Sequence, residues 1–169
     1  KLLKNTQTKL IVVISYPFGA TSTETKMFEA MQALKIGADE LDMVMNIGAF
    51  KSKNFDFVKK DIQGVVNAGK GVPVKVIIET GFLSHEEIST ASKLVVESGA
   101  QFVKTCSGYG SRGVSITDIK IIRNSVGQDF GIKASGGIHT AHHAIALLNA
   151  GATRIGTSRA KNVIETLKQ

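Results

Sequence analysis

Residues 94–108 read Leu-Val-Val-Glu-Ser-Gly-Ala-Gln-Phe-Val-Lys-Thr-Cys-Ser-Gly, and this stretch decides the fold. A segment of helical period ends at Gly99, and an apolar strand follows over residues 102–107. Glycine at the end of a helix allows the left-handed conformation that closes its last turn. The stretch therefore predicts a chain in which helices lead directly into strands.

The same helix–glycine–strand step recurs elsewhere in the chain. It appears at residues 33–38 and 147–152 and, more loosely, at residues 65–69. The repeating unit is about 25–30 residues long, which is the size of one βα step. Because no linker or low-complexity segment interrupts the repeats, we expect residues 1–169 to form a single domain of (βα) repeats.

The expected strands are rich in Val and Ile on both faces, which is typical of buried parallel strands. We expect them at residues 9–16, 40–46, 72–80, 102–107, 131–134 and 154–157. We expect helices at residues 22–36, 55–67, 85–97, 116–124, 141–149 and 161–167. Several helix starts carry capping residues, such as Ser84 with Glu87 and Ser115 with Asp118.

Strands joined in series by helices leave two architectures, an open doubly wound sheet or a (βα)8 barrel. A G-x-G-x-x-G fingerprint after the first strand, typical of dinucleotide-binding sheets, is absent. Polar residues at the carboxyl ends of nearly every strand favour the barrel, whose sites draw on many strands. We therefore expect an α/β fold of the TIM (βα)8-barrel type with six of the eight βα units present, an incomplete barrel.

Composition restricts the class of partner. The formal net charge of +7 suits either nucleic acid or an anionic small molecule. The basic residues are spread along the chain, and no Trp and two Tyr leave little to stack on bases, so we expect no nucleic-acid partner. There is no run of about 18 apolar residues, so we expect no membrane partner. The single cysteine, Cys106, excludes an internal disulfide and suits the reducing cytoplasm, which we take as the expected location.

Two lysines in apolar strands are the main candidates for catalysis. Burying the Lys104 ammonium is costly, so the side chain tends to lose its proton, and a neutral amine can form a Schiff base with a carbonyl. Alternatively, Lys104 points outward between the helices. Lys133 lies on the next strand, about 4.8 Å away, and two inward lysines would lower each other's pKa. The pair therefore indicates a reactive site rather than a structural feature.

Charged residues on two other strands extend this hypothesis. Alternation along residues 40–46 places Asp42 on the same side as Val44 and Asn46, facing the lumen. There the Asp42 carboxylate can move protons to and from a carbinolamine, or it is a structural ion-pair partner. Lys75 and Glu79 are four residues apart on one expected strand, so alternation places them on the same face. They either extend the polar lumen or form a buried structural pair.

Glycine-bearing turns follow the last two expected strands. Backbone N–H groups near helix N-termini bind phosphate, and phosphate sites in barrels often follow strands 7 and 8. We therefore expect the substrate phosphate at Gly136, Gly137, Gly156, Thr157 and Ser158.

The remaining candidates favour structural roles. His139, His142 and His143 do not have metal-ligand spacing with another donor, so we expect no metal site. We expect these histidines at a solvated helix start. Cys106 is expected to pack as a small buried thiol.

Taken together, six segments resemble the 2-deoxyribose-5-phosphate aldolase family of class I aldolases. The matching residues are 16–21, 38–44, 74–80, 102–105, 133–137 and 154–158, in order over nearly the whole chain. The resemblance implies a TIM barrel that reversibly cleaves 2-deoxy-D-ribose 5-phosphate to acetaldehyde and D-glyceraldehyde 3-phosphate. It also implies Lys104 as the Schiff-base lysine, Lys133 as the residue that lowers its pKa, and Asp42 as a proton relay through water. No metal or other cofactor is needed, because the iminium is the electron sink.

The chain departs from the family pattern at several points. The match begins at what would be the third strand, so the first two βα units of the family have no counterpart in residues 1–169. His139 stands where arginine is usual, Arg159 where a second serine is common, and Cys106 where serine or threonine is usual. Unpaired sheet edges predict a homo-oligomer, dimeric or larger. Two alternatives to the aldolase follow: an inactive remnant that binds phosphate or a partner, and a Schiff-base barrel enzyme for another phosphosugar.

Overall fold

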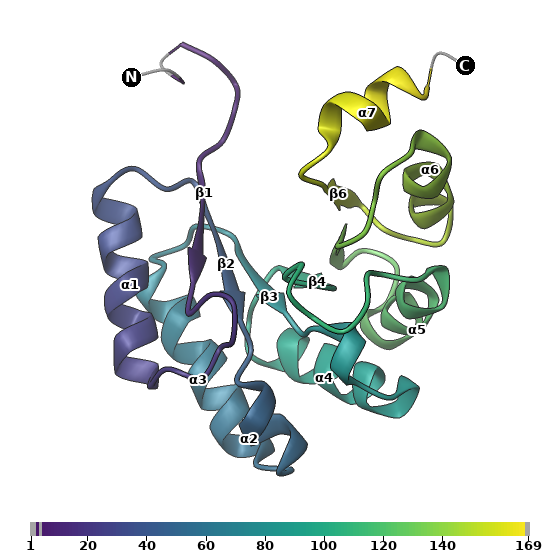
Figure 1. The fold of residues 1–169 in the computed structure, drawn as a ribbon. Helices are drawn as coiled ribbons and strands as arrows, with labels where there is room; N and C mark the ends of the chain where they lie inside the picture. Colours follow the sequence, from purple (N-terminus) through teal and green to yellow (C-terminus); the bar gives the residue numbers. More distant parts are fainter. Residues whose placement is uncertain (1–2, 4, 168–169) are drawn as a thin grey trace.

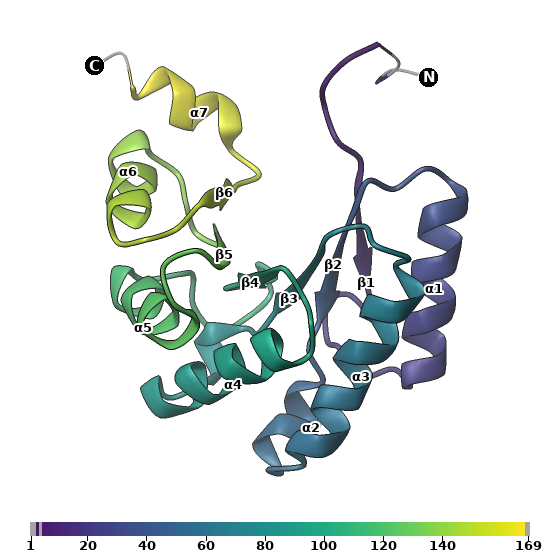
Figure 2. The same ribbon diagram turned by 180° about the vertical axis from the view of Figure 1, so that it is seen from behind.

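The computed structural model describes residue 3 and residues 5–167, which form a six-stranded parallel sheet with helices on one side (Figure 1). The strands lie in chain order as β1 (Ile11–Ile14), β2 (Glu40–Val44), β3 (Val74–Ile77), β4 (Phe102–Lys104), β5 (Gly131–Ser135) and β6 (Arg154–Gly156). Figures 1 and 2 show that the sheet curves into a half-barrel, with the helices around its convex side. The predicted α/β barrel-type fold with six βα units is confirmed.

The helices begin close to the residues that the sequence predicts. They are α1 (Thr23–Lys35), α2 (Ile47–Lys51), α3 (Phe55–Ala68), the 3-10 helix η1 (Thr80–Phe82), α4 (His85–Glu97), α5 (Ile116–Val126), α6 (Ala141–Asn149) and α7 (Ala160–Glu165). The predicted capping boxes at Ser84 and Ser115 are both present. The short α2 and η1 were not predicted. Each begins three residues after the last residue of a strand, and the Asn46 side chain caps α2 by accepting a hydrogen bond from the Ala49 N–H.

Strand alternation divides the molecule into an apolar layer and a charged face. Leu41 and Met43 are fully buried in the hydrophobic core between sheet and helices. Asp42 pairs in register with Lys75, and Lys104 with Lys133, so these residues share the concave face of the sheet. The curvature of the half-barrel thus gathers charged side chains from several strands into one place.

The two edge strands leave the concave face open. Among the described residues, β1 and β6 each have one neighbouring strand. Ile11 and Val13 pair in register with Glu40 and Asp42, and both apolar side chains are substantially exposed.

Within the described part of the chain, no helix has the length and apolar character needed to cross a membrane.

A fully buried ion pair joins two helices on the convex side. Lys26 Nζ on α1 lies 2.5 Å from Asp61 Oδ2 on α3, and neither side chain is exposed. Lys26 also donates to the Val44 carbonyl at the end of β2, and Thr23 Oγ1 donates to Asp61 Oδ1. The pair therefore anchors α1 and α3 to the strand that carries Asp42.

We expect Lys26→Met to lower the free energy of unfolding by about 3 kcal/mol, because it leaves the Asp61 carboxyl group buried without its counter-charge. Urea denaturation measures the effect. Lys26→Met combined with Asp61→Leu should recover much of the loss. The control, Lys59→Met, breaks the more exposed pair with Glu97 and should cost less than about 1 kcal/mol. Equal costs for the two lysine variants would contradict this interpretation.

Candidate active site

Two lysines on adjacent strands share one carboxylate oxygen on the concave face. Lys104 Nζ on β4 lies 2.7 Å from Asp42 Oδ2, and Lys133 Nζ on β5 lies 2.8 Å from the same atom. Both lysines are about nine-tenths buried and Asp42 almost completely. The structure thus places Lys104, Lys133 and Asp42 together in the lumen, and the alternative of an outward Lys104 is wrong.

A second layer of charges supports Asp42 from below. Its Oδ1 atom forms an ion pair with Lys75 Nζ at 2.9 Å, and Lys75 also lies 2.5 Å from Glu40 Oε2. Arg154 on β6 reaches the same Glu40 oxygen at 2.5 Å. The Lys75 ammonium and the Arg154 guanidinium both lie over the Phe102 ring. This network closes the floor of the concave face with paired charges.

The burial and pairing of these groups change their ionisation. Burial by itself would raise the pKa of Asp42, but Lys104 and Lys133 overcome that effect and lower it to about 2. Burial is also the main reason that the pKa of Lys133 is lowered, and the charges of Lys104 and Lys75 act in the same direction. Asp42 is therefore an anion at neutral pH, and Lys133 loses its proton more easily than an exposed lysine.

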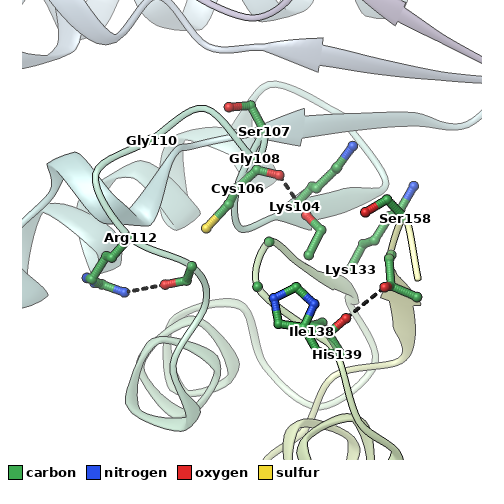
Figure 3. Close-up of a pocket in the computed structure, with 16 residues that line it drawn as sticks. Lys104, Cys106, Ser107, Gly108, Gly110, Arg112, Lys133, Ile138, His139 and Ser158 are labelled. Atoms are coloured by element: carbon green, nitrogen blue, oxygen red, sulfur yellow. Dashed lines mark hydrogen bonds between the residues drawn. The ribbon is translucent and has the colours of Figure 1, made fainter. Parts of the chain in front are cut away.

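A cavity of about 670 Å³ opens above the two lysines at the carboxyl ends of the strands (Figure 3). Lys104 and Lys133 line it, and Asp42 lies behind them. All five residues expected to bind phosphate also line it: Gly136, Gly137, Gly156, Thr157 and Ser158. The lysines and the glycine-bearing turns therefore face one common space.

Local backbone geometry explains the glycines of the first turn. Gly136 and Gly137 have φ angles of 93° and 72°, which side chains rarely allow. A Cβ atom on Gly136 would also lie 2.8 Å from Cys106 Cβ. The Thr157 hydroxyl of the second turn donates to the Ile138 carbonyl and so joins the two turns.

Lys75 and Glu79 do not form the pair that was left open by the sequence. Lys75 contacts Glu40 and Asp42, whereas Glu79 accepts hydrogen bonds from Ser107. Glu79 does not continue the alternation of the strand, because β3 ends at Ile77 and Glu79 adopts a left-handed backbone conformation. Lys75 therefore extends the polar lumen, and Glu79 does not.

Several cavity residues were not predicted from the sequence. Ser107, Gly108 and Gly110 line one wall, together with Arg112. The Arg112 guanidinium makes two hydrogen bonds to the buried Asp118 carboxylate, so it braces the loop after β4. The sequence indicated Asp118 as a capping residue, but no local pattern signals its pairing with arginine.

Two of the candidate histidines are exposed, whereas the cysteine is buried. His139 is exposed and lines the cavity, and His142 is exposed at the start of α6. Among the described residues, no group of three His, Cys, Asp or Glu side chains is arranged to hold a metal ion. Cys106 is buried beside the Gly136 turn, and burial raises the pKa of its thiol.

A half-barrel of parallel βα units with an amine-bearing cavity at the carboxyl ends of its strands defines an enzyme of the TIM-barrel type. The family model for "DeoC/LacD family aldolase" matches residues 3–165, and the chain belongs to this family. The expectation of an aldolase, a lyase that acts on carbon–carbon bonds, is confirmed.

Curated relatives and solved structures agree with this assignment. The chain is 52% identical to the deoxyribose-phosphate aldolase of Aciduliprofundum boonei over 99% of its own length and 77% of the relative. It is 50% identical to that of Thermococcus gammatolerans, over 96% of its length and 73% of the relative. Among solved structures, the chain matches the deoxyribose phosphate aldolase of Aeropyrum pernix, which is described as a unique tetrameric structure. The match has a TM-score of 0.90 at 33% sequence identity and covers 99% of this chain and 71% of that one.

Proposed function

We propose that this aldolase reversibly cleaves 2-deoxy-D-ribose 5-phosphate to acetaldehyde and D-glyceraldehyde 3-phosphate through a Schiff base on Lys104. The observation that carries the proposal is the shared Asp42 oxygen, which holds Lys104 and Lys133 together at the base of the cavity. The curated relatives named deoxyribose-phosphate aldolase support the choice of substrate.

The reaction begins when the neutral Lys104 amine adds to the C1 carbonyl of the substrate. The carbinolamine loses water to give an iminium ion. The iminium accepts the electron pair of the C2–C3 bond as that bond breaks, while the C3 hydroxyl loses its proton. Glyceraldehyde 3-phosphate leaves, and an enamine remains on Lys104. Protonation of the enamine at C2 and hydrolysis of the resulting iminium release acetaldehyde and restore the amine.

Asp42 and Lys133 manage the protons of these steps. The Asp42 carboxylate is proposed to relay protons through water between the carbinolamine and the solvent. The charge of Lys104 is one of the causes, after burial, that lower the pKa of Lys133. The lowered pKa of Lys133 and its contact with Asp42 suit it to give and take back a proton during the cycle.

The glycine-bearing turns are proposed to bind the phosphate. Gly136, Gly137, Gly156, Thr157 and Ser158 line the cavity, and their backbone N–H groups and the Ser158 hydroxyl are the proposed donors. The Thr157 hydroxyl donates to the Ile138 carbonyl and holds the two turns together. An anion held there leaves C1 of a five-carbon sugar directed toward the lysines.

Ser158→Ala tests the phosphate site. We expect KM for deoxyribose 5-phosphate to rise about tenfold, the effect of losing one hydrogen bond to a charged group, while KM for unphosphorylated deoxyribose changes little. Steady-state kinetics with both sugars measure the ratio, and Ser52→Ala, at the exposed end of α2, is the control. Equal increases for both sugars would remove Ser158 from the phosphate site.

Product analysis tests the whole proposal. Incubation with deoxyribose 5-phosphate should release acetaldehyde, which alcohol dehydrogenase and NADH detect as it forms. A chain that releases no acetaldehyde and forms no Schiff base would be the inactive remnant. Turnover of another phosphosugar in a panel of phosphorylated aldehydes, without turnover of deoxyribose 5-phosphate, would indicate a different substrate.

The proposal includes a homo-oligomer in the cytoplasm. The tetramer described for the Aeropyrum pernix protein and the exposed Ile11 and Val13 at the sheet edge support association between copies of the chain. The free buried thiol of Cys106 agrees with a reducing compartment. Size-exclusion chromatography with light scattering tests the first point, and a monomer at micromolar concentration would contradict it.

A further inference from the structure

Glu79 is a buried acidic residue that the proposed reaction does not use. Its side chain is 1% exposed, and its backbone has φ 55° and ψ 68°. This left-handed conformation is costly for a residue with a side chain and persists only where surrounding contacts hold it. Among the described residues, Glu79 forms no ion pair with the lysines of the concave face, so another contact must account for its position.

The carboxyl group of Glu79 holds the loop that follows β4. Its Oε2 atom accepts hydrogen bonds from the Ser107 N–H at 3.0 Å and from the Ser107 hydroxyl. The same hydroxyl accepts from the Tyr109 N–H at 3.1 Å, and the Tyr16 hydroxyl donates to the Ser107 carbonyl at 2.5 Å. All the polar groups of Ser107 are therefore occupied by contacts that set the shape of the loop.

The second carboxyl oxygen of Glu79 adds an independent observation. Oε1 is buried and has no hydrogen-bond partner among the described residues. It lies against Gly110, where an added Cβ atom would be 2.5 Å from it. The Glu79 side chain is therefore packed against Gly110 through one oxygen and hydrogen-bonded to Ser107 through the other.

The loop held by Glu79 is a wall of the active-site cavity. Ser107, Gly108 and Gly110 line the cavity between Lys104 at its base and the glycine-bearing turns opposite (Figure 3). A sugar attached to Lys104 at C1, with its phosphate in those turns, would pass its middle carbons along this wall. A two-carbon aldehyde on Lys104 is too short to reach from the base to the turns.

We propose that Glu79 is a positioning residue that shapes the Ser107–Gly110 wall for the phosphorylated part of the substrate. The inference rests on the proposed function and deepens it. It separates two steps that share Lys104: formation of the Schiff base with acetaldehyde, which does not need the wall, and cleavage of the C2–C3 bond, which does.

Glu79→Leu tests the proposal, because it keeps a side chain of similar size at the left-handed position but removes the acceptor for Ser107. We expect kcat/KM for deoxyribose 5-phosphate to fall about a hundredfold, as a displacement of about 1 Å at the reacting atoms can cost that much. The yield of acetaldehyde trapped on Lys104 by borohydride should stay within about twofold. Glu79→Gln keeps an acceptor oxygen and should restore most of the cleavage rate.

Gly110→Ala perturbs the same contact without removing the carboxyl group, since the new methyl group displaces Glu79 Oε1. It should reproduce the pattern of Glu79→Leu, so the proposal stays testable even if that variant does not fold. Glu86→Leu, at an exposed position on α4, and Gly48→Ala, whose added Cβ makes only an ordinary contact in α2, are the matched controls. Both should keep normal cleavage and trapping.

The outcomes separate the two proposals. Loss of cleavage with preserved trapping supports the positioning role. Parallel loss of cleavage and trapping with a lowered Tm shows a purely structural role and overturns it, as does unchanged cleavage in both Glu79→Leu and Gly110→Ala. If the unaltered chain forms no borohydride-trapped adduct, the proposed function falls, and the positioning role falls with it.

Discussion

Replacement of Lys104 by methionine should abolish the borohydride-trapped adduct with acetaldehyde and lower the turnover of deoxyribose 5-phosphate at least about a thousandfold, because the nucleophile is lost. Methionine fills a similar volume without the amine. Asp42 keeps its contacts with Lys133 and Lys75 in this variant, so the fold should persist. Mass spectrometry of the reduced protein locates the adduct, and circular dichroism checks the fold.

The control for this experiment is Lys120→Met, which removes an exposed lysine on α5. It should form the adduct on Lys104 in normal yield. An adduct of equal yield in Lys104→Met, at Lys133 or any other lysine, would contradict the assignment of Lys104 as the nucleophile.

Replacement of Asp42 by asparagine should have the second largest effect, because three buried lysines lose their common counter-charge. We expect a loss of about 5 kcal/mol in the free energy of unfolding at pH 7, at the upper end for a broken buried pair. The cleavage rate should fall about a thousandfold, since no carboxylate remains to relay protons. Urea denaturation and steady-state kinetics measure the two effects, and Asp39→Asn, at an exposed position just before β2, is the control.

The free energy of unfolding should depend on pH differently in the unaltered chain and in Asp42→Asn. In the unaltered chain, the pKa of Asp42 is lowered from 3.8 to about 2, so its stabilising contribution is present above pH 4 and is lost as the pH falls toward 2. Asp42→Asn should lack this acid-sensitive contribution. Its stability should instead rise with increasing pH, because burial lowers the pKa of Lys133 and this lysine loses its proton without the Asp42 carboxylate beside it. A variant with the same pH profile as the unaltered chain would show that Asp42 does not hold the lysines together.

Much of this architecture is predictable because it depends on local patterns. The glycine that follows a helix, as at Gly99, locates the next strand, and alternation along residues 40–44 correctly directs Asp42 into the lumen. The register of a parallel sheet then brings Lys104 beside Lys133. These features follow from the chemistry of neighbouring residues in the chain or of adjacent strands.

Other parts of the site depend on contacts that no local pattern contains. Glu79 continues the alternation of β3 in the sequence, but the strand ends at Ile77 and Glu79 itself adopts a left-handed backbone conformation. Arg112 forms its hydrogen bond to Asp118 because the loop after β4 brings Arg112 back to the start of α5. Alternation cannot predict either contact, because it applies only while the chain remains extended.

The ion pair between Arg154 and Glu40 has a mechanical consequence. These residues belong to β6 and β2, which are not neighbours in the sheet, so their contact spans the concave side as a chord spans an arc. The length of a chord limits how far its arc can flatten. Without this tie, β6 would be held to the sheet mainly by its pairing with β5, and Gly156, Thr157 and Ser158 could move more easily away from the amines. Several ion pairs thus limit the flattening of the sheet, and the guanidinium–carboxylate contact of Arg154 with Glu40 is the one that extends this restraint to β6.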